Sequence, residues 1–518
     1  MGEELYELPQ GWVWAFLSEL GELNRGKSKH RPRDDAKLYG GKYPFIQTGD
    51  VRNSNSVIKT YTQTYSELGL TQSKLWDKDT LCITIAANIA ETALLGISAC
   101  FPDSIVGFIA DNRICSVHYI HYFIKSIKTK LDSYAPATAQ KNINLNILRI
   151  VSVPLPPLSE QHRIVAKIEE LFTQLDAGVE LLKKVKAKLK RYRQAVLKAA
   201  VEGELTAYWR TAHQGELEPA SVLLDRILKQ RREKWEAEQL AKMKAQGKTP
   251  KDDSWKLKYK EPVAPDVSDL PDLPHGWCWV TLPQIGELNR GKSKHRPRND
   301  PKLYGGQYPF IQTGDVRSAN GVIHSYTQTY SDEGLKQSRL WSKGTLCITI
   351  AANIAETAIL GFDACFPDSI VGFISESNYC DIKWIEFFIR TAKDNLERYA
   401  PATAQKNINL EILSDLAVPL PSLEEQNKIV EQLELIFSVA DQLEKTIDTN
   451  LKRADKLRQT ILKQAFEGKL VPQDPSDEPA EKLLERIQAE KAKQVTTKTK
   501  KKTKSEPKSS TQLALQLE

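Results

Sequence analysis

The stretch TLCITIAANIAETA occupies residues 80–93 and returns letter for letter at residues 345–358. It belongs to a longer repeat, in which residues 9–158 correspond to residues 274–423 at an offset of 265. The same offset relates further stretches, among them GKSKHRPR at 26–33, IQTGDVR at 46–52, CFPDSIVGFI at 100–109 and YAPATAQKNINL at 134–145. Solenoid repeats are much shorter, at roughly 20–50 residues per unit. The chain therefore contains one whole domain twice.

The composition is that of a globular protein. With 518 residues, of which 41% are hydrophobic, the chain can form about three to four domain-sized units. The formal net charge of +7 suits a polyanionic partner without establishing one. The seven cysteines form no CxxC pair, which favours buried thiols in a reducing compartment over disulfides or a metal site. We find no signal peptide and no apolar run of about 18 residues, so a cytoplasmic location is expected.

The repeat continues into two long helices. LPPLSEQHRIVAKIEELF at 155–172 matches LPSLEEQNKIVEQLELIF at 420–437. Apolar residues then recur in steps of four and three, which predicts a heptad seam on each helix. The seam positions are Ile164, Ile168, Leu171, Leu175, Leu182, Val185, Leu189, Tyr192 and Val196 in the first helix, and Ile429, Leu433, Ile436, Ala440, Leu443, Ile447, Leu457 and Ile461 in the second. Ser159 is the expected N-cap of the first helix. The two helices are expected to pack on each other; the alternative is that each lies on its own domain.

The predicted fold class is α+β, with two mixed α/β domains separated by the long helices. Runs such as TLCITIAA and SIVGFI predict strands, and the stretch after Ser116 has helical spacing. The expected segments are a globular domain at 1–158, a long helix at 159–203, short helices and a charged connector at 204–273, a second globular domain at 274–423, a second long helix at 424–468, a C-terminal helix at 469–494 and a disordered lysine-rich tail at 495–518.

One motif points to nucleotide binding. Residues 21–28 and 286–293 both satisfy the phosphate-loop pattern G-x-x-x-x-G-K-[ST]. In such a loop the lysine and serine begin a helix whose N-terminus binds phosphate. Here the next residues are Lys-His-Arg-Pro-Arg, a poor helix start, so the glycines are expected to serve a turn. A tandem nucleotide-binding protein remains the alternative. The sequence contains no HExxH, no GxSxG and no Cys/His metal spacing, so neither a catalytic nor a metal site is expected.

The loops that are identical in both copies carry cations and amides. GKSKHRPR places five potential cations in eight positions, a density that suits phosphates. Asn and Gln can contact adenine through two hydrogen bonds, and Arg or Lys can contact guanine. The alternatives are a solvated charged loop and local capping of turns. The predicted DNA-binding residues are Arg25, Lys27, Lys29, His30, Arg31, Arg33, Gln47, Thr48, Arg52, Asn88, Gln140, Lys141 and Asn142, with Arg290, Lys292, Lys294, His295, Arg296, Arg298, Gln312, Thr313, Arg317, Asn353, Gln405, Lys406 and Asn407 in the second copy.

The assembly of motifs resembles the specificity subunit of type I restriction-modification systems. Each domain opens with Leu-Pro-x-Gly-Trp-x-Trp and ends with PLPPLSEQ or PLPSLEEQ, and the spacers carry EGELTAYW at 202–209 and EGKLVPQDPSDEPAEKLLERI at 467–487. The resemblance implies two target-recognition domains held apart by antiparallel helices. It also implies double-stranded DNA as ligand, methyltransferase subunits that bind S-adenosylmethionine and flip the target adenine, and a restriction subunit that uses ATP and Mg. The specificity chain itself is then no enzyme and needs no cofactor.

This sequence departs from the family's pattern in one respect. The two recognition domains are usually dissimilar, whereas here they share roughly two thirds of their residues over the repeat. Antiparallel helices would relate them by a pseudo-twofold axis, so that each domain faces the duplex in the opposite sense. The hypothesis is that the target is an interrupted inverted repeat. A coiled-coil scaffold whose globular domains bind protein is the remaining alternative.

Overall fold

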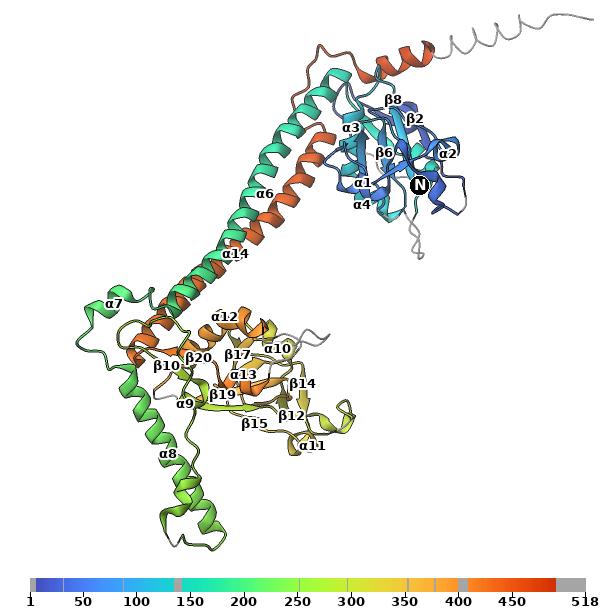
Figure 1. The fold of residues 1–518 in the computed structure, drawn as a ribbon. Helices are drawn as coiled ribbons and strands as arrows, with labels where there is room; N and C mark the ends of the chain where they lie inside the picture. Colours follow the sequence, from blue (N-terminus) through green and yellow to red (C-terminus); the bar gives the residue numbers. More distant parts are fainter. Residues whose placement is uncertain are drawn as a thin grey trace, which may run out of the picture. The chain divides into compact units, whose positions relative to one another are not determined.

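The computed structural model describes residues 6–30, 32–86, 88–134, 142–250, 252–295, 297–351, 354–376, 379–398 and 409–490. The chain forms two compact units, Met1–Lys183 with Asp448–Glu518, and Lys184–Ile447. Each unit contains one copy of the repeated domain and a part of both long helices (Figure 1). Each long helix is therefore divided between the two units, and the first unit is made of two separate stretches of the chain.

The repeated domain is built on a five-stranded sheet. In the first copy the strand order is β2 (Gly21–Arg25), β8 (Ile105–Ala110), β6 (Leu81–Thr84), β7 (Thr92–Leu95) and β4 (Val57–Ile58). All neighbours are antiparallel except β4 and β7, which are parallel. Strands β6 and β7 are buried along their whole length, as expected for apolar runs covered on both faces.

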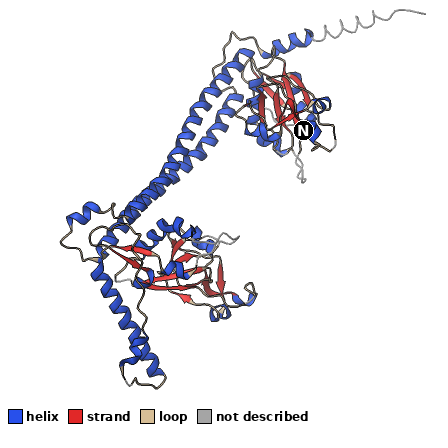
Figure 2. Ribbon diagram, viewed as in Figure 1, coloured by secondary structure: helices blue, strands red, loops and turns tan. Residues whose placement is uncertain are grey.

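Alternate side chains of the sheet enter two different cores. Leu81 and Ile83 pack in the core that also contains α3 (Val117–Ser126), whereas Cys82 points to the core with Trp76 and Val51. The alternation follows from the two-residue period of a strand. The predicted strands and the predicted helix after Ser116 are confirmed, and Figure 2 shows both copies as mixtures of helix and strand.

A small second sheet carries part of the candidate site. Strand β3 (Tyr39–Phe45) pairs antiparallel with β5 (Gln63–Tyr65), and α1 (Thr48–Asn53) follows β3. Phe45 stacks on Tyr65 with ring centroids 4.0 Å apart. The remaining elements of the first domain are β1 (Val13–Phe16), η1 (Leu17–Glu19), η2 (Ala36–Leu38), α2 (Glu67–Thr71), α4 (Lys128–Ser133), α5 (Leu145–Arg149) and β9 (Ser152–Leu155), the last paired with β1.

The second domain repeats this architecture, with the strand order β11-β19-β16-β17-β13 in its large sheet. Its elements are β10 (Cys278–Thr281), α9 (Leu282–Ile285), β11 (Gly286–Arg290), η4 (Pro301–Leu303), β12 (Tyr304–Phe310), α10 (Thr313–Ser318), β13 (Val322–Ile323), β14 (Gln328–Tyr330), α11 (Asp332–Lys336), β15 (Leu340–Trp341), β16 (Leu346–Thr349), β17 (Thr357–Leu360), β18 (Ala364–Cys365), β19 (Ile370–Ser375), α12 (Ile382–Arg398), α13 (Leu410–Ser414) and β20 (Ala417–Leu420).

The long helices are α6 (Leu158–Val201) and α14 (Leu423–Phe466). In the first unit, the N-terminal part of α6 packs on the C-terminal part of α14, where Arg458 pairs with Asp176 and lies over Phe172. In the second unit, the C-terminal part of α6 packs on the N-terminal part of α14, where Arg193 pairs with Asp441 at 2.5 Å. The helices therefore pack on each other in antiparallel order, as the resemblance implied.

Two details of the helix prediction are wrong. Ser159 lies inside the first turn and is not the N-cap, because the Pro157 carbonyl already accepts a helical hydrogen bond from Gln161. Proline suits the start of a helix because no N–H is needed there. The seam is also incomplete, since Val185 is 43% and Tyr192 51% exposed. A pair of helices covers only a narrow stripe on each, so residues at the edge of the stripe stay in solvent.

The shorter helices follow the long ones. They are α7 (Ala207–Ala212), α8 (Ala220–Ala245) and η3 (Asp253–Lys258) after α6, and a helix at 480–490 after α14. Within the described ranges, no helix has both the length and the apolar character that a membrane crossing requires.

A buried joint ties each domain to its helices. In the first unit, Nε1 of Trp12 donates to Oε2 of Glu160 at 3.1 Å, and Gln473 donates to Oε1 of the same carboxylate at 3.3 Å. In the second unit, Glu425 receives the indole of Trp277 at 2.8 Å and the hydroxyl of Thr206 at 2.7 Å. Glu160, at the start of α6, therefore binds Gln473, which follows α14. Glu425, at the start of α14, binds Thr206, which follows α6.

The glycine that follows each long helix belongs to this joint. Gly468 has φ +70°, and a Cβ there would lie 2.3 Å from Cγ of Pro9. Gly203 has φ +73°, and its Cβ would lie 2.5 Å from Cγ of Pro274. Only glycine fits both the left-handed conformation and the close approach. The opening Leu-Pro-x-Gly-Trp motifs and the EGEL and EGKL motifs are therefore parts of one structural contact.

Candidate nucleic-acid interface

The basic loop after β2 lies against the segment that precedes β8. The amide of Gly26 donates to the Ile105 carbonyl at 2.9 Å, and that of Lys27 donates to the Phe101 carbonyl at 3.2 Å. A Cβ on Gly26 would lie 2.3 Å from the carbonyl oxygen of Pro102, so glycine is needed for this close approach. The loop is thus attached to the edge of the large sheet by its backbone.

These contacts exclude a phosphate-binding loop. Residues 21–25 form strand β2 instead of a turn before a helix. The amides of Lys29 and His30 both donate to Oε1 of Gln72, at 2.6 and 3.2 Å. A phosphate cradle needs free backbone N–H groups at the start of a helix, and here four of these amides already have partners. The tandem nucleotide-binding interpretation is therefore wrong.

Two of the predicted arginines hold the loop in place. Nη2 of Arg33 lies 3.0 and 2.9 Å from the two carboxylate oxygens of Asp103, and Nε of Arg25 donates to the Asp103 carbonyl at 3.0 Å. The second copy repeats these contacts with Arg298, Arg290 and Asp368. Exposed pairs contribute at most about 1 kcal/mol to stability, so the main effect is on the position of the loop.

The remaining cations of the loop differ in their surroundings. Nε2 of His30 lies 3.1 Å from Oδ2 of Asp35. The pKa of Asp35 is lowered by the backbone N–H of Lys37 and further by its contact with His30. Lys27 and Lys29 are exposed, and among the described residues their ammonium groups have no ionic partner. The same holds for Lys292 and Lys294 of the second copy. These lysines are the cations that the loop presents to solvent.

A second group of predicted residues meets at the turn between β6 and β7. Nη1 of Arg52, at the end of α1, lies 3.5 Å from Oδ1 of Asn88. Asn142 forms an isolated bridge with Ala86 in the same turn. Ala90 has φ +57°, a left-handed conformation that is uncommon outside glycine. Strain of this kind is often found at functional sites, and the second copy repeats it at Ala355.

The structure adds one residue in each copy that the sequence reasoning missed, Gln63 and its counterpart Gln328. Gln47, which precedes α1, donates its side-chain amide to Gln63 on β5 at 2.5 Å. Gln312 and Gln328 form the same bond in the second copy. The sequence signal that could have pointed to Gln63 is the stretch YTQTY, which is identical at 61–65 and 326–330.

The remaining described candidates lie on the short helices. Thr48 and Thr313 are the first residues of α1 and α10, and Arg317 is exposed on α10.

Part of the prediction lies outside the described residues. This applies to Arg31, Gln140, Lys141, Arg296, Asn353, Gln405, Lys406 and Asn407. The described candidates therefore form two groups in the first copy: the basic loop with its anchors, and the group of Arg52, Asn88 and Asn142, with the glutamine pair at the other end of α1.

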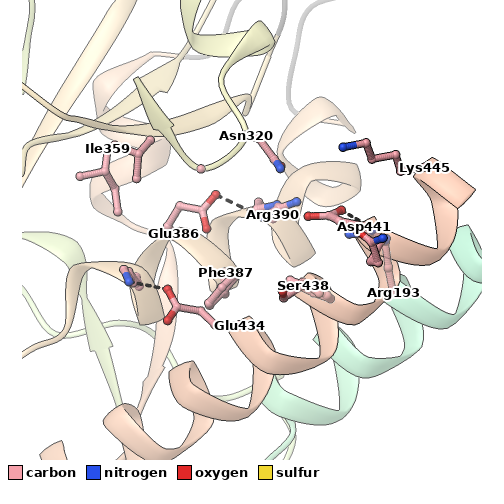
Figure 3. A pocket seen from close by; sticks show the side chains of 15 residues that line it. Arg193, Asn320, Ile359, Glu386, Phe387, Arg390, Glu434, Ser438, Asp441 and Lys445 are labelled. Carbon is pink, nitrogen blue, oxygen red and sulfur yellow. Dashed lines mark hydrogen bonds and ion pairs between the residues drawn. The ribbon is translucent and has the colours of Figure 1, made fainter. Parts of the chain in front are cut away.

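A groove in the second unit is lined by α12, α14 and α6 (Figure 3). It has a volume of about 520 Å³ and is lined by several charged side chains. Those charges pair with each other: Arg390 lies 3.6 Å from Glu386, Arg193 pairs with Asp441, and Lys383 donates to Glu434. The groove is a polar joint between the domain and its helices, and none of the predicted DNA-binding residues that the structure describes lines it.

Comparison with known proteins agrees with this architecture. The family model described as "Type I restriction modification DNA specificity domain" matches residues 9–191 and 274–453. The EcoKI specificity subunit of Escherichia coli K12 is 25% identical over 516 residues, which cover 94% of this chain and 97% of that protein. The StySPI specificity subunit of Salmonella potsdam is 24% identical, with 94% and 96% covered.

Two solved structures share the fold. One, described as the "structural basis underlying complex assembly and conformational transition of the type I R-M system", has a TM-score of 0.64 at 17% identity and covers 90% of this chain and all of its own. The HsdS subunit from Thermoanaerobacter tengcongensis has a TM-score of 0.53 at 18% identity, with the same coverage. Because the family model matches more than half of the sequence, this chain belongs to the DNA specificity family of type I restriction-modification systems, as one of its non-catalytic specificity subunits.

Proposed function

We propose that this chain reads a two-part DNA site for a type I restriction-modification complex and that the two half-sites have the same sequence. The observation that carries the proposal is that identical cation and amide loops stand on equivalent sheets in both units. Exposed Lys27 and Lys29 suit phosphate contacts, which supply affinity without sequence information. The amide and guanidinium groups of Gln47, Arg52 and Asn88 suit base edges.

The inverted arrangement of the half-sites is supported by the construction of the two units. Each unit combines one domain, the first part of the long helix that follows it, and the last part of the other long helix. The joints at Glu160 and Glu425 contain the same tryptophan–glutamate bond, and in each a side chain from the segment after the other long helix also donates to the carboxylate. In our proposal the two equivalently attached domains read the same sequence on opposite strands, as the subunits of a twofold dimer do.

The partners follow from the family. In our proposal, methyltransferase subunits dock on this chain, bind S-adenosylmethionine and flip the target adenine. A restriction subunit with ATP and Mg would act in the same complex. This chain would contribute binding and orientation only, and no cofactor of its own.

The direct test uses the full chain with and without a methyltransferase subunit. Each preparation is mixed with a library of random duplexes, and the bound DNA is sequenced. Enrichment of one two-part motif supports the proposal. If neither preparation enriches a motif, the chain is no DNA reader, and the alternative of a protein-binding scaffold gains support.

A further inference from the structure

The glutamine pair is fixed from both sides by the small sheet. Gln63 lies directly opposite Phe45 in the β3–β5 register, and Phe45 stacks on Tyr65. The backbone N–H of Gln47 donates to Oδ2 of Asp50 at 2.8 Å. Oδ1 of the same carboxylate accepts from Thr62, the neighbour of Gln63, at 3.3 Å. Both backbones that carry the pair are therefore tied to each other.

The second copy repeats the arrangement in every contact. Gln312 donates to Gln328 at 2.5 Å, its backbone N–H donates to Asp315 at 2.8 Å, and Thr327 donates to Asp315 at 3.3 Å. The neighbouring aromatic pair also has the same centroid distance of 4.0 Å. An exposed glutamine normally loses rotamer freedom when it binds. Here the amide is already oriented before any ligand arrives, which lowers that entropic cost.

The hydrogen-bonding groups left over after this contact match one base. Nε2 of Gln47 carries two hydrogens, and one is used on Gln63. Within the described part of the chain, its second hydrogen and its Oε1 remain for a ligand, as a donor beside an acceptor in one plane. In the major groove, adenine presents the N7 acceptor beside the N6 donor, whereas guanine presents two acceptors. The remaining groups of Gln47 therefore suit adenine and leave one group unmatched on guanine.

We infer that Gln63 and Gln328 are positioning residues for specificity, each of which holds its partner glutamine in the orientation that reads an adenine in the major groove. The inference rests on the proposed function, because it needs the chain to read DNA. Since the pair is the same in both copies, the adenine occupies the same position in each half-site. Gln47 and Gln312 are then the residues that touch the base.

The test replaces the acceptor in both copies, with Gln63→Leu and Gln328→Leu, in the full chain together with its methyltransferase subunit. Selection from random duplexes is expected to show that the preference for adenine at one position per half-site falls by about tenfold to a hundredfold. The other positions keep their preferences. Gln194→Leu on α6 is the matched control, because it removes an exposed glutamine amide outside the recognition domains.

A rescue variant separates positioning from a general loss of structure. Gln63→Glu with Gln328→Glu keeps an oxygen that accepts from Nε2 of Gln47 and Gln312, so the adenine preference is expected to persist. In addition, Gln47→Leu combined with Gln63→Leu should cost no more than Gln47→Leu alone, because Gln63 acts only through Gln47.

The failures of the two ideas are distinguishable. If the unaltered chain is selective and the leucine variants keep their adenine preference, the role of Gln63 is refuted and the proposed function stands. Additive losses in the double variant would also refute it. If the unaltered chain selects no sequence, the proposed function fails and this inference falls with it.

Discussion

The indole nitrogen of Trp12 donates a hydrogen bond of 3.1 Å to the buried carboxylate of Glu160, 148 residues further along the chain. Trp277 makes the equivalent bond to Glu425 across the same separation. The two bonds attach each domain to the start of the helix that follows it. Each carboxylate also accepts a hydrogen bond from a residue that follows the other long helix: Gln473 donates to Glu160, and Thr206 donates to Glu425. The joint therefore makes the two domains equivalent in their attachment as well as in their sequence.

Trp12→Phe should destabilise the first unit. The substitution leaves Oε2 of the buried Glu160 without its donor, which costs about 1–3 kcal/mol in the free energy of unfolding. Urea unfolding with a fluorescence or circular dichroism readout measures the loss. Trp14→Phe is the control, because Trp14 is half-buried and its indole nitrogen has no hydrogen bond within the described part of the chain. Equal losses in both variants would show that the bond to Glu160 contributes nothing.

The stability of the first unit should fall as the pH drops below about 6.5, the usual pKa of histidine. His121 is buried, and burial holds the pKa of its ring well below that value. Below pH 6.5 the unfolded chain gains a proton that the folded chain does not, so stability is lost by up to about 1.4 kcal/mol per pH unit. The second unit has Glu386 at the equivalent position, and burial raises the pKa of that carboxyl.

His121→Leu should remove this dependence. Urea unfolding between about pH 7.5 and 5.5 is the measurement, and the variant is expected to lose less stability over that range than the unaltered chain. His118→Gln is the control, because His118 is only partly buried on the same helix. If the pH dependence of the His121→Leu variant equals that of the unaltered chain, the buried imidazole does not titrate as described.

Replacing the free lysines of the basic loop should weaken DNA binding at every sequence alike. The changes are Lys27→Ala and Lys29→Ala with their counterparts Lys292→Ala and Lys294→Ala. Each lost phosphate contact is expected to reduce the slope of log K against log salt concentration by about 0.9. Lys188→Ala on α6 is the control, being an exposed lysine away from the loops. An unchanged slope would mean that these lysines do not touch phosphate.

Asp103→Asn, with Asp368→Asn, should lower sequence discrimination without lowering non-specific binding. The change weakens the hold of the Asp103 side chain on Arg33 and removes a negative charge, while the bond of Arg25 to the Asp103 backbone carbonyl is kept. We expect specific affinity to fall by up to about fivefold per copy, equivalent to ~1 kcal/mol. Titrations with specific and random duplexes measure the ratio. Asp34→Asn is a close control, because the second copy already carries Asn299 there. Parallel losses for both duplexes would contradict this role.

The sequence predicted the duplication, the strands and the paired helices because these follow from local patterns. The 3.6-residue and two-residue periods depend on neighbours a few residues apart. The contacts of the site join distant residues: Arg33 meets Asp103 and Lys29 meets Gln72. No pattern among neighbouring residues predicts such long-range pairs. The ion pair of Arg33 with Asp103 was therefore not predicted, and Gln63 was missed although its stretch is repeated.

The exposed seam residues illustrate a second limit. Val185 and Tyr192 fit the heptad pattern as well as Ile164 does, yet only Ile164 is buried. The difference is that Ile164 packs in the core of the recognition domain, whereas Val185 and Tyr192 belong to none of the hydrophobic cores formed by the described residues. Periodicity gives the face of a helix, and the neighbours decide how much of that face is buried.

The central claim is that one half-site is read twice, in opposite directions. Long-read sequencing of modified adenines in a host that carries this chain and its methyltransferase subunit tests it most directly. The account predicts one interrupted motif whose two halves are the same sequence on opposite strands, with at most small differences. Two unrelated half-sites in the recovered motif would contradict it.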